Sequence, residues 1–163
     1  QGVDWMALSF VRHPEDLMEL QDLISEHGSY KIPIIAKIEK PEAVENIDKI
    51  VAYCDGLMVA RGDLAVEVGW QNLGRAIREI FHLCRAAHVP IVWATQVLES
   101  LAKKGTPSRS EIVDAIISSQ ADCIMLNKGP YINQSIALLD SLIRQVDHTR
   151  KHGFPVYEKL KII

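Results

Sequence analysis

The chain has 163 residues, of which 48% are hydrophobic and 24% charged, and its formal net charge is −3. These values are typical of a soluble globular protein with a real core, and we interpret residues 1–163 as a single domain. The mild charge forms no basic stripe, and no apolar run approaches the roughly 20 residues that span a bilayer, so we expect neither a nucleic-acid nor a membrane partner.

Cysteine usage indicates an intracellular protein. The cysteines, Cys54, Cys84 and Cys123, are odd in number and widely spaced, and each lies in or beside an apolar segment. We expect reduced, buried thiols, and no CxxC or His/Cys spacing predicts a zinc site. The first residues also lack a basic region followed by an apolar one, so the predicted location is cytoplasmic.

Five short apolar segments recur along the chain, and each is predicted to form a strand. They are too short for free-standing helices, and their nearly continuous apolar character is typical of strands buried on both faces of a parallel sheet. The segments are VDWMALSF (3–10), IPIIAKIE (32–39), DGLMVARGD (55–63), VPIVWATQ (89–96) and ADCIMLNK (121–128).

Helices are predicted between these strands. The first begins with Pro14 and acidic residues and ends at Gly28, which are start and stop signals of a helix. In the fourth helix, Ser110 is the predicted N-cap. The five predicted helices cover 14–28, 41–56, 72–90, 108–120 and 134–153. This alternation, at the spacing of βα units, predicts an α/β fold with parallel strands.

The predicted strands share polar C-terminal ends. In an α/β barrel the active site is built from the C-terminal ends of the strands. A dinucleotide-binding sheet would instead carry a G-x-G-x-x-G motif after its first strand, and this sequence has none. The polar ends therefore favour a barrel. They comprise Ser9, Arg12, Lys37, Glu39, Arg61, Gly62, Asp63, Thr95, Gln96, Glu99, Asn127 and Lys128.

The ends of the second and third strands predict a divalent metal site. Side chains two residues apart on a strand project the same way, so Glu39 is expected beside Lys37. The same spacing predicts that Asp63 lies beside Arg61. The carboxylates of Glu39 and Asp63 are then expected to converge from neighbouring strands as ligands of Mg²⁺ or Mn²⁺, with positions left for water and substrate.

Two further groups are expected to act on a substrate at that metal. Lys37 would add positive charge where an enolate or phosphoryl transition state gains negative charge. Gly62 would let backbone N–H groups approach a substrate carboxylate. Two other interpretations stay open: the charges are ion pairs on a solvated rim, or Lys37 is the Schiff-base lysine of a barrel aldolase. Neighbouring carboxylates oppose the second, because they keep a lysine charged.

Four motifs carry a resemblance to a known family. They are IIAKIEKPEAVENIDKI…DGLMVARGDLAVEV, VPIVWATQVLESL, PSRSEIVDA and ADCIMLN, within about residues 3–128. In this order and spacing they resemble the second half of the catalytic (β/α)8 barrel of pyruvate kinases. The resemblance implies the equivalents of strands 4–8 of a TIM-type barrel, incomplete as a single chain. The first barrel strands, the lid domain and the C-terminal regulatory domain have no counterpart here.

The resemblance also implies residue roles. Lys37 resembles the lysine that stabilises the enolate and the phosphoryl group, and Thr95 the threonine near the carbon that is protonated. Glu39 and Asp63 resemble the protein ligands of the divalent cation. The turn at 60–63 resembles the one whose backbone N–H groups hold the substrate carboxylate. The implied catalytic residues are thus Lys37, Thr95 and Arg61, and the implied substrate-binding residues are Ala60, Gly62, Asp63 and Thr95.

The implied reaction is phosphoryl transfer from phosphoenolpyruvate to ADP, which gives pyruvate and ATP in glycolysis. It uses Mg²⁺ and K⁺, but the K⁺ ligands and much of the nucleotide site belong to the half of the barrel that is not in this chain. ADP and ATP are therefore expected partners only if that half is supplied.

Two alternative functions stay open. The same half-site suits a Mg²⁺-dependent aldolase, lyase or decarboxylase that acts on pyruvate-like enolates. The other alternative is a non-catalytic binding module of the pyruvate kinase type. This alternative is supported by the sequence after the last strand. The family typically has SGETAKG there, whereas this chain has NKGPYINQS, with Asn127 in place of a serine.

Five parallel strands of a barrel leave two open edges, which expose unpaired backbone groups and apolar surface. We expect the remainder of a longer chain or self-association to cover these edges. An open sheet capped by the last helix is a further possibility, and the C-terminal segment 150–163 is another candidate cover.

Overall fold

The computed structural model describes residues 2–28 and 30–151. These residues form two compact units, and each is described by itself. Unit 1 comprises the described residues up to Gln96 together with Ala121–Met125, and unit 2 comprises Val97–Gln120 and the described residues from Leu126 onward. The interpretation of 1–163 as a single domain stays a prediction.

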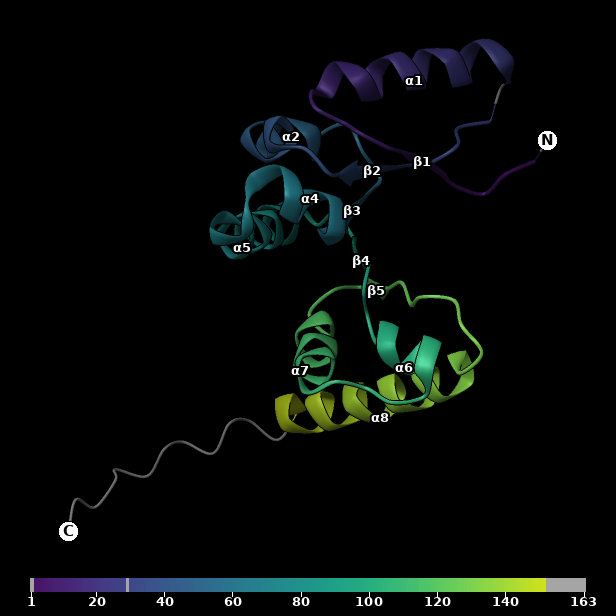
Figure 1. Ribbon diagram of the computed structural model, residues 1–163. Helices are drawn as coiled ribbons and strands as arrows, with labels where there is room; N and C mark the ends of the chain where they lie inside the picture. Colours follow the sequence, from purple (N-terminus) through teal and green to yellow (C-terminus); the bar gives the residue numbers. More distant parts are fainter. Residues whose placement is uncertain (1, 29, 152–163) are drawn as a thin grey trace. The chain divides into compact units, whose positions relative to one another are not determined.

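Unit 1 is built on a parallel sheet whose strand order follows the chain. The strands are β1 (Met6–Leu8), β2 (Ile34–Ile38), β3 (Gly56–Ala60), β4 (Ile91–Ala94) and β5 (Cys123–Ile124). All five predicted strands are confirmed. A sequential parallel order is that of consecutive barrel strands, and Figure 1 shows the five strands following one another along a curved line.

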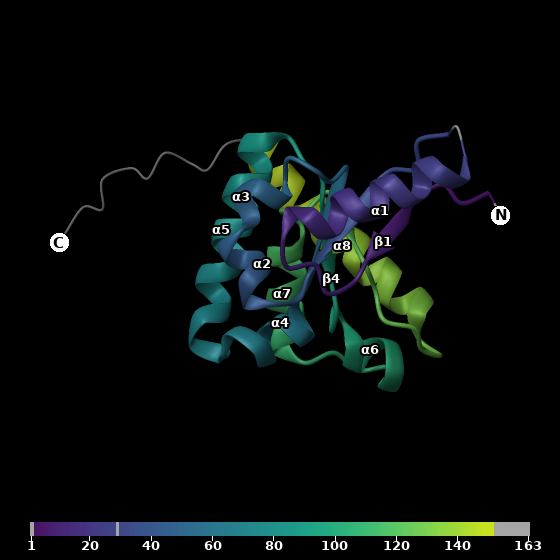
Figure 2. The same cartoon turned by 90° about the horizontal axis from the view of Figure 1, so that it is seen from above.

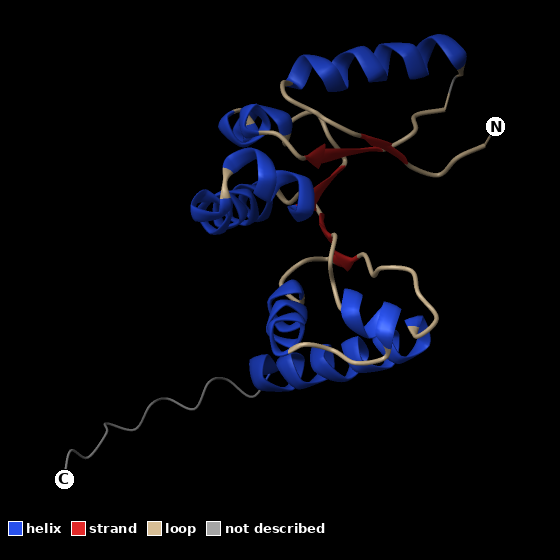
Figure 3. Cartoon of the chain, in the orientation of Figure 1, coloured by secondary structure: helices blue, strands red, loops and turns tan. Residues whose placement is uncertain are grey.

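The helices of unit 1 connect successive strands. They are α1 (Pro14–His27), α2 (Pro41–Glu45), α3 (Ile47–Ile50), α4 (Arg61–Val68) and α5 (Trp70–Ala87). Figures 1 and 3 show α1, α2 and α5 on the outer side of the curved sheet. Helix α3 contacts both α1 and α5, and Figure 2 shows α3 and α5 from above.

The core of unit 1 lies between the sheet and these helices. Leu17 from α1, Ile50 from α3 and Ile80 from α5 are completely buried. Each such side chain stabilises the fold by about 1.5–3 kcal/mol through removal of apolar surface from water. Trp93 of β4 is 2% exposed and meets Phe81 of α5 edge to face, with ring centroids 5.5 Å apart. These contacts fix the outer helix layer on the strands.

One predicted helix is wrong in its extent. Residues 41–56 do not form a single helix, because α2 ends at Glu45 and α3 begins at Ile47 and ends at Ile50. Asn46 between them has φ −106° and ψ 14°, and its side-chain amide donates to the carbonyl of Glu42 at 2.9 Å. Such local hydrogen bonds of asparagine compete with helix continuation.

Unit 2 contains α6 (Glu99–Lys104), α7 (Arg109–Ser118) and α8 (Ile132–Lys151), and α8 contacts both others. The sequence did not predict α6. The predicted N-cap of α7 is wrong, because the capping residue is Ser108 and not Ser110. The Ser108 hydroxyl accepts from the N–H of Glu111 at 3.2 Å, and the Glu111 carboxylate accepts from the N–H of Ser108 at 2.7 Å. This reciprocal pair is a capping box.

The three cysteines, all predicted to be buried, differ in their burial. Cys84 is buried and Cys54 half-buried, and burial raises the pKa of these thiols to about 12 and about 11. The prediction of a buried thiol is wrong for Cys123, which is exposed on β5, an edge strand of the described sheet.

The C-terminal segment 150–163 was a candidate cover for an open sheet edge, and its residues 152–163 lie outside the described residues. Among the described residues, no helix has the length and apolar character of a membrane span.

Candidate functional site

The predicted site residues of the second strand lie at the C-terminal end of β2, in unit 1. Glu39 directly follows the strand, and only 2% of its surface is exposed. Its Oε1 atom accepts from Lys37 Nζ at 2.8 Å, and its Oε2 atom accepts from the N–H of Phe10 at 2.7 Å. Lys37 Nζ also donates to Ser9 Oγ at 2.7 Å. Lys37 and Glu39 therefore lie side by side, as the strand alternation predicts.

The loop after β1 fixes this pair through its backbone. Phe10 has φ 58°, in the left-handed region, which costs a non-glycine residue about 1–2 kcal/mol. Its N–H donates to the buried carboxylate, while Phe10 as a whole is 58% exposed and its ring centroid lies 5.8 Å from Lys40 Nζ. The backbone of Phe10 thus serves the site, and the residue type gave no signal of this.

The third strand ends earlier than predicted. β3 ends at Ala60, which is buried and is the N-cap of α4, and Arg61 is the first helical residue. The predicted strand alternation of Arg61 and Asp63 is therefore wrong, because both residues belong to the first turn of a helix. Asp63 is exposed there, at the positive end of the helix dipole.

The sheet register brings the ends of β2 and β3 next to each other, and the two predicted metal ligands follow these ends in the sequence. Ile38 of β2 pairs with Val59 of β3, so Glu39 follows β2 beside the point where Ala60 leads into α4. Asp63 lies three residues further along the chain. Carboxylate oxygens are ligands of the type that Mg²⁺ and Mn²⁺ prefer.

The donor set fits a divalent cation by type. Each carboxylate oxygen of Glu39 accepts one hydrogen bond from the protein and keeps a further lone pair. Within residues 2–28 and 30–147 there is no group of three or more His, Cys, Asp or Glu side chains that could hold a metal ion. A cation held by Glu39 and Asp63 would therefore take its other ligands from water and substrate, as Mg²⁺ commonly does.

Thr95 follows β4 and lies against the first turn of α4. Its Oγ1 atom accepts from the N–H of Gly62 at 2.8 Å. Thr95 has φ 67° and Gln96 has φ 58°, which is uncommon for non-glycine residues and an outlier for a β-branched one. The structure thus brings Thr95 and Gly62 together, although 33 positions separate them in the sequence.

The Arg61 guanidinium is held within unit 1. Its Nε atom donates to the carbonyl of Ala94 at 3.1 Å, and its Nη2 atom donates to the carbonyl of Thr95. Its central carbon lies 4.3 Å from the centroid of the Trp93 ring. The sequence did not predict these contacts. The signal that could have indicated them is an arginine directly after one strand, Arg61, and a tryptophan near the end of the next strand, Trp93.

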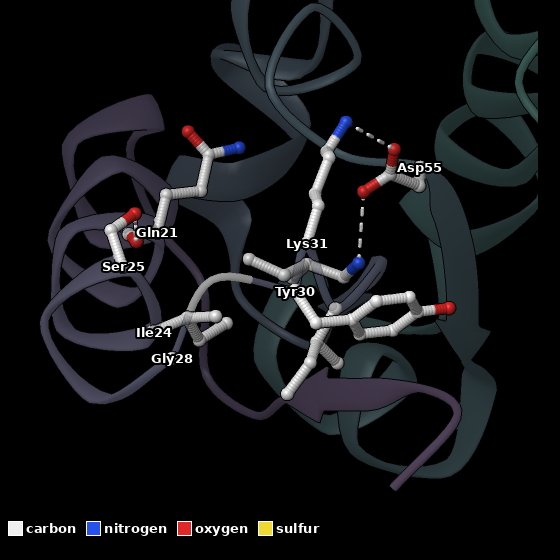
Figure 4. A pocket seen from close by; sticks show the side chains of 9 residues that line it. Gln21, Ile24, Ser25, Gly28, Tyr30, Lys31 and Asp55 are labelled. Atoms are coloured by element: carbon white, nitrogen blue, oxygen red, sulfur yellow. Dashed lines mark hydrogen bonds and ion pairs between the residues drawn. The ribbon is translucent and has the colours of Figure 1, made fainter.

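A cavity of about 470 Å³ lies at the opposite, N-terminal end of the strands (Figure 4). Asp55, which precedes β3, accepts from Lys31 Nζ at 3.2 Å and from the N–H of Ile34 at 2.9 Å. The Lys31 side chain is 79% exposed. These contacts tie the starts of β2 and β3 together, and the predicted site residues lie at the other end of the same strands.

The altered loop after the last strand lies in unit 2. The N–H of Tyr131 donates to the carbonyl of Ala102 in α6 at 3.0 Å. A β-carbon on Gly129 would lie 2.1 Å from that same carbonyl oxygen, so only glycine fits there. The segment 127–131 (NKGPY) therefore forms a close contact with α6.

Comparisons with known proteins identify what the chain is similar to. Residues 1–136 match the family model described as pyruvate kinase, barrel domain. A pyruvate kinase of Bacillus licheniformis is 38% identical over 158 residues, which cover 93% of this chain and 27% of that protein. A pyruvate kinase of Agrobacterium vitis is 39% identical, with coverage of 96% and 33%.

A solved structure of a pyruvate kinase is similar in fold to this chain. The crystal structure of a pyruvate kinase from Cryptosporidium parvum superposes with a TM-score of 0.85 at 34% identity, and the match covers 90% of this chain and 32% of that one. This chain therefore spans about a quarter to a third of the length of the relatives that it matches.

Proposed function

This chain belongs to the pyruvate kinase family, and we propose that it forms the metal- and enolate-binding part of that enzyme's barrel. The observation that carries the proposal is the buried Glu39 carboxylate, paired with Lys37 at 2.8 Å at the C-terminal end of β2. In barrel enzymes this end of the strands carries the chemistry. The full protein would transfer the phosphoryl group of phosphoenolpyruvate to ADP, giving pyruvate and ATP.

Lys37 is the proposed electrostatic catalyst. Its ammonium is already placed by Ser9 at 2.7 Å and by Glu39, so its charge needs little reorganisation during the reaction. It would face the phosphoryl group during transfer and the enolate oxygen afterwards. Both groups gain or carry negative charge, which a fixed positive charge stabilises.

Glu39 and Asp63 are the proposed protein ligands of Mg²⁺ or Mn²⁺. The bound cation would supply positive charge that polarises the substrate oxygens. The surroundings of the two carboxylates differ. Glu39 is buried and held by two hydrogen-bond donors, so it is fixed in place, whereas Asp63 is exposed in the first turn of α4.

The start of α4 and Thr95 are the proposed carboxylate site. The first N–H groups of a helix have no partner within the helix and favour anions. Here the N–H of Gly62 donates to Thr95 Oγ1, so the threonine hydroxyl lies where a substrate carboxylate would approach. Thr95 is also the proposed group nearest the carbon that accepts a proton.

The remaining partners are proposed for the full protein. K⁺ and ADP would bind largely to the part of the barrel outside this chain. That part would also cover the sheet edges at β1 and β5. Trp5, which directly precedes β1, is 52% exposed. The glycolytic role and the cytoplasmic location belong to the same proposal.

One alternative function would use the same pair of side chains, Lys37 and Glu39 at 2.8 Å. A lyase, aldolase or decarboxylase that acts on pyruvate-like enolates needs no nucleotide site. Lys37, Glu39 and Asp63 would serve such a reaction equally well. Dependence of the reaction on ADP separates the two functions.

The test measures pyruvate formation from phosphoenolpyruvate with Mg²⁺ and K⁺, with and without ADP. It uses the chain alone and a chimaera in which the chain replaces the matching segment of the Bacillus licheniformis relative. We expect ADP-dependent pyruvate formation by the chimaera, reduced by at least about a hundredfold in Lys37→Met. Lys49→Met, which removes an exposed lysine of α3, is the matched control and should retain activity.

Two results would contradict the proposal. A folded chimaera that forms no pyruvate would show that this segment has lost the reaction. Turnover of pyruvate-like acids that does not respond to ADP would favour the lyase-type alternative.

A further inference from the structure

We propose that Arg61 is a positioning residue, which holds Thr95 in the orientation that receives a substrate carboxylate and does not itself contact substrate. The identity of that ligand rests on the proposed function. The structural part of the proposal rests on contacts within unit 1 alone.

The first observation is where Arg61 donates two hydrogen bonds. They reach the carbonyls of Ala94 and Thr95. These carbonyls belong to the two peptide groups on either side of the Thr95 α-carbon. Holding both peptide groups fixes φ and ψ of Thr95 together. The planar guanidinium presents its donors as a rigid fork, which suits two neighbouring acceptors.

The second observation is the support beneath the guanidinium. It stacks at 4.3 Å on the Trp93 ring, which is 2% exposed and meets Phe81 at its edge. A cation over a buried indole face is a desolvated and favourable contact. The ring sets the plane of the guanidinium, so Nε and Nη2 point to the two carbonyls.

The third observation is the strain at the held residue. Thr95 and Gln96 are consecutive residues with positive φ, 67° and 58°. A β-branched residue adopts this conformation only where its surroundings impose it. The Arg61 hydrogen bonds to the carbonyls of Ala94 and Thr95 hold the peptide groups on both sides of Thr95, and we infer that they impose this conformation on it.

These contacts together place the Thr95 hydroxyl. With φ and ψ held, Oγ1 lies 2.8 Å from the N–H of Gly62 at the start of α4. Without Arg61, we expect Thr95 to relax toward an extended conformation and Oγ1 to leave Gly62. The carboxylate site would then lose its hydroxyl even though α4 and its N–H groups remain.

The test follows Gly62 and Thr95 by NMR in the full chain without ligand. Arg61→Lys keeps the charge but loses the fork. We expect hydrogen exchange of the Gly62 amide to rise by at least about tenfold, and the Thr95 ¹³C shifts to move toward extended values. Thr95→Val, which removes Oγ1, should raise Gly62 exchange similarly. Arg78→Lys on the exposed face of α5 is the matched control and should change neither signal.

An internal reference separates a local effect from general unfolding. The N–H of Leu57 donates to the carbonyl of Pro90 at 2.9 Å, at the other end of the same strands. Its exchange should stay unchanged in Arg61→Lys. If Gly62 exchange and Thr95 shifts in Arg61→Lys stay within about twofold of the unchanged chain, the proposal is overturned. If Leu57 also exchanges rapidly, Arg61→Gln is measured at lower temperature by the same criteria.

A titration with Mg²⁺ and oxalate, a planar dicarboxylate that resembles an enolate, connects this result to function. We expect Arg61→Lys to bind oxalate at least about tenfold more weakly than the unchanged chain. Equal affinity in the two would overturn the positioning role. If the unchanged chain binds no oxalate, the proposed function of this segment fails, and the exchange of Gly62 alone decides the role of Arg61.

Discussion

Replacement of Lys37 by methionine is expected to destabilise unit 1 by about 3 kcal/mol, because the Glu39 carboxylate would stay buried without its positive partner. The Glu39 side chain is 3% exposed and that of Lys37 is 24% exposed, so solvent screens the lysine more than the carboxylate. This places the expected loss at the lower end of the values for broken buried pairs. Urea unfolding of the unchanged chain and the variant measures it.

Two comparisons make this result specific to the buried pair. The double variant Lys37→Met/Glu39→Leu should recover most of the loss, since it removes both buried charges. Lys31→Met breaks the exposed pair with Asp55 and should change stability by less than about 1 kcal/mol. Equal losses for Lys37→Met and Lys31→Met would contradict the description of Glu39 as a buried, paired carboxylate.

Substitution of Gly129 by alanine is expected to destabilise unit 2 by about 3 kcal/mol. The new β-carbon would lie 2.1 Å from the carbonyl oxygen of Ala102 and 2.5 Å from its carbon. Both are backbone atoms, which cannot rotate away as a side chain can. The same oxygen accepts the N–H of Tyr131 next to the start of α8, so relief of the clash would also weaken that bond. Thermal unfolding measures the loss.

Gly74→Ala is the matched control for this substitution. Gly74 lies within α5, and a β-carbon there would meet nothing within 4 Å. Alanine is favoured over glycine in a helix by about 0.5–1 kcal/mol, so this variant should be slightly more stable than the unchanged chain. A similar small effect of both substitutions would show that the loop does not approach α6 as described.

The fold could be predicted because its signals are local. Buried parallel strands are short and apolar along their whole length, as in Ile34–Ile38, and Pro14 marked the start of the first helix. The change from β3 to α4 carries no such signal. Its N-cap is Ala60, which has no capping side chain, so the charged residues after it were interpreted as a continued strand.

Strand alternation could predict contacts only between residues close together in the sequence. Lys37 and Glu39 are two positions apart, so alternation was enough to bring them together. The bonds from Phe10 to Glu39 and from Gly62 to Thr95 join residues 29 and 33 positions apart. Both depend on positive φ at Phe10 and Thr95, residue types that seldom adopt it. Residue identity therefore could not indicate these contacts.

The most direct measurement is Mn²⁺ binding to the chain by electron paramagnetic resonance, because the central claim is a divalent cation held by Glu39 and Asp63. We expect one bound Mn²⁺ per chain. Glu39→Gln and Asp63→Asn should each weaken binding by at least about tenfold. Asp48→Asn, at an exposed acid of α3, should leave it unchanged. Equal Mn²⁺ affinity in all four proteins would contradict the account.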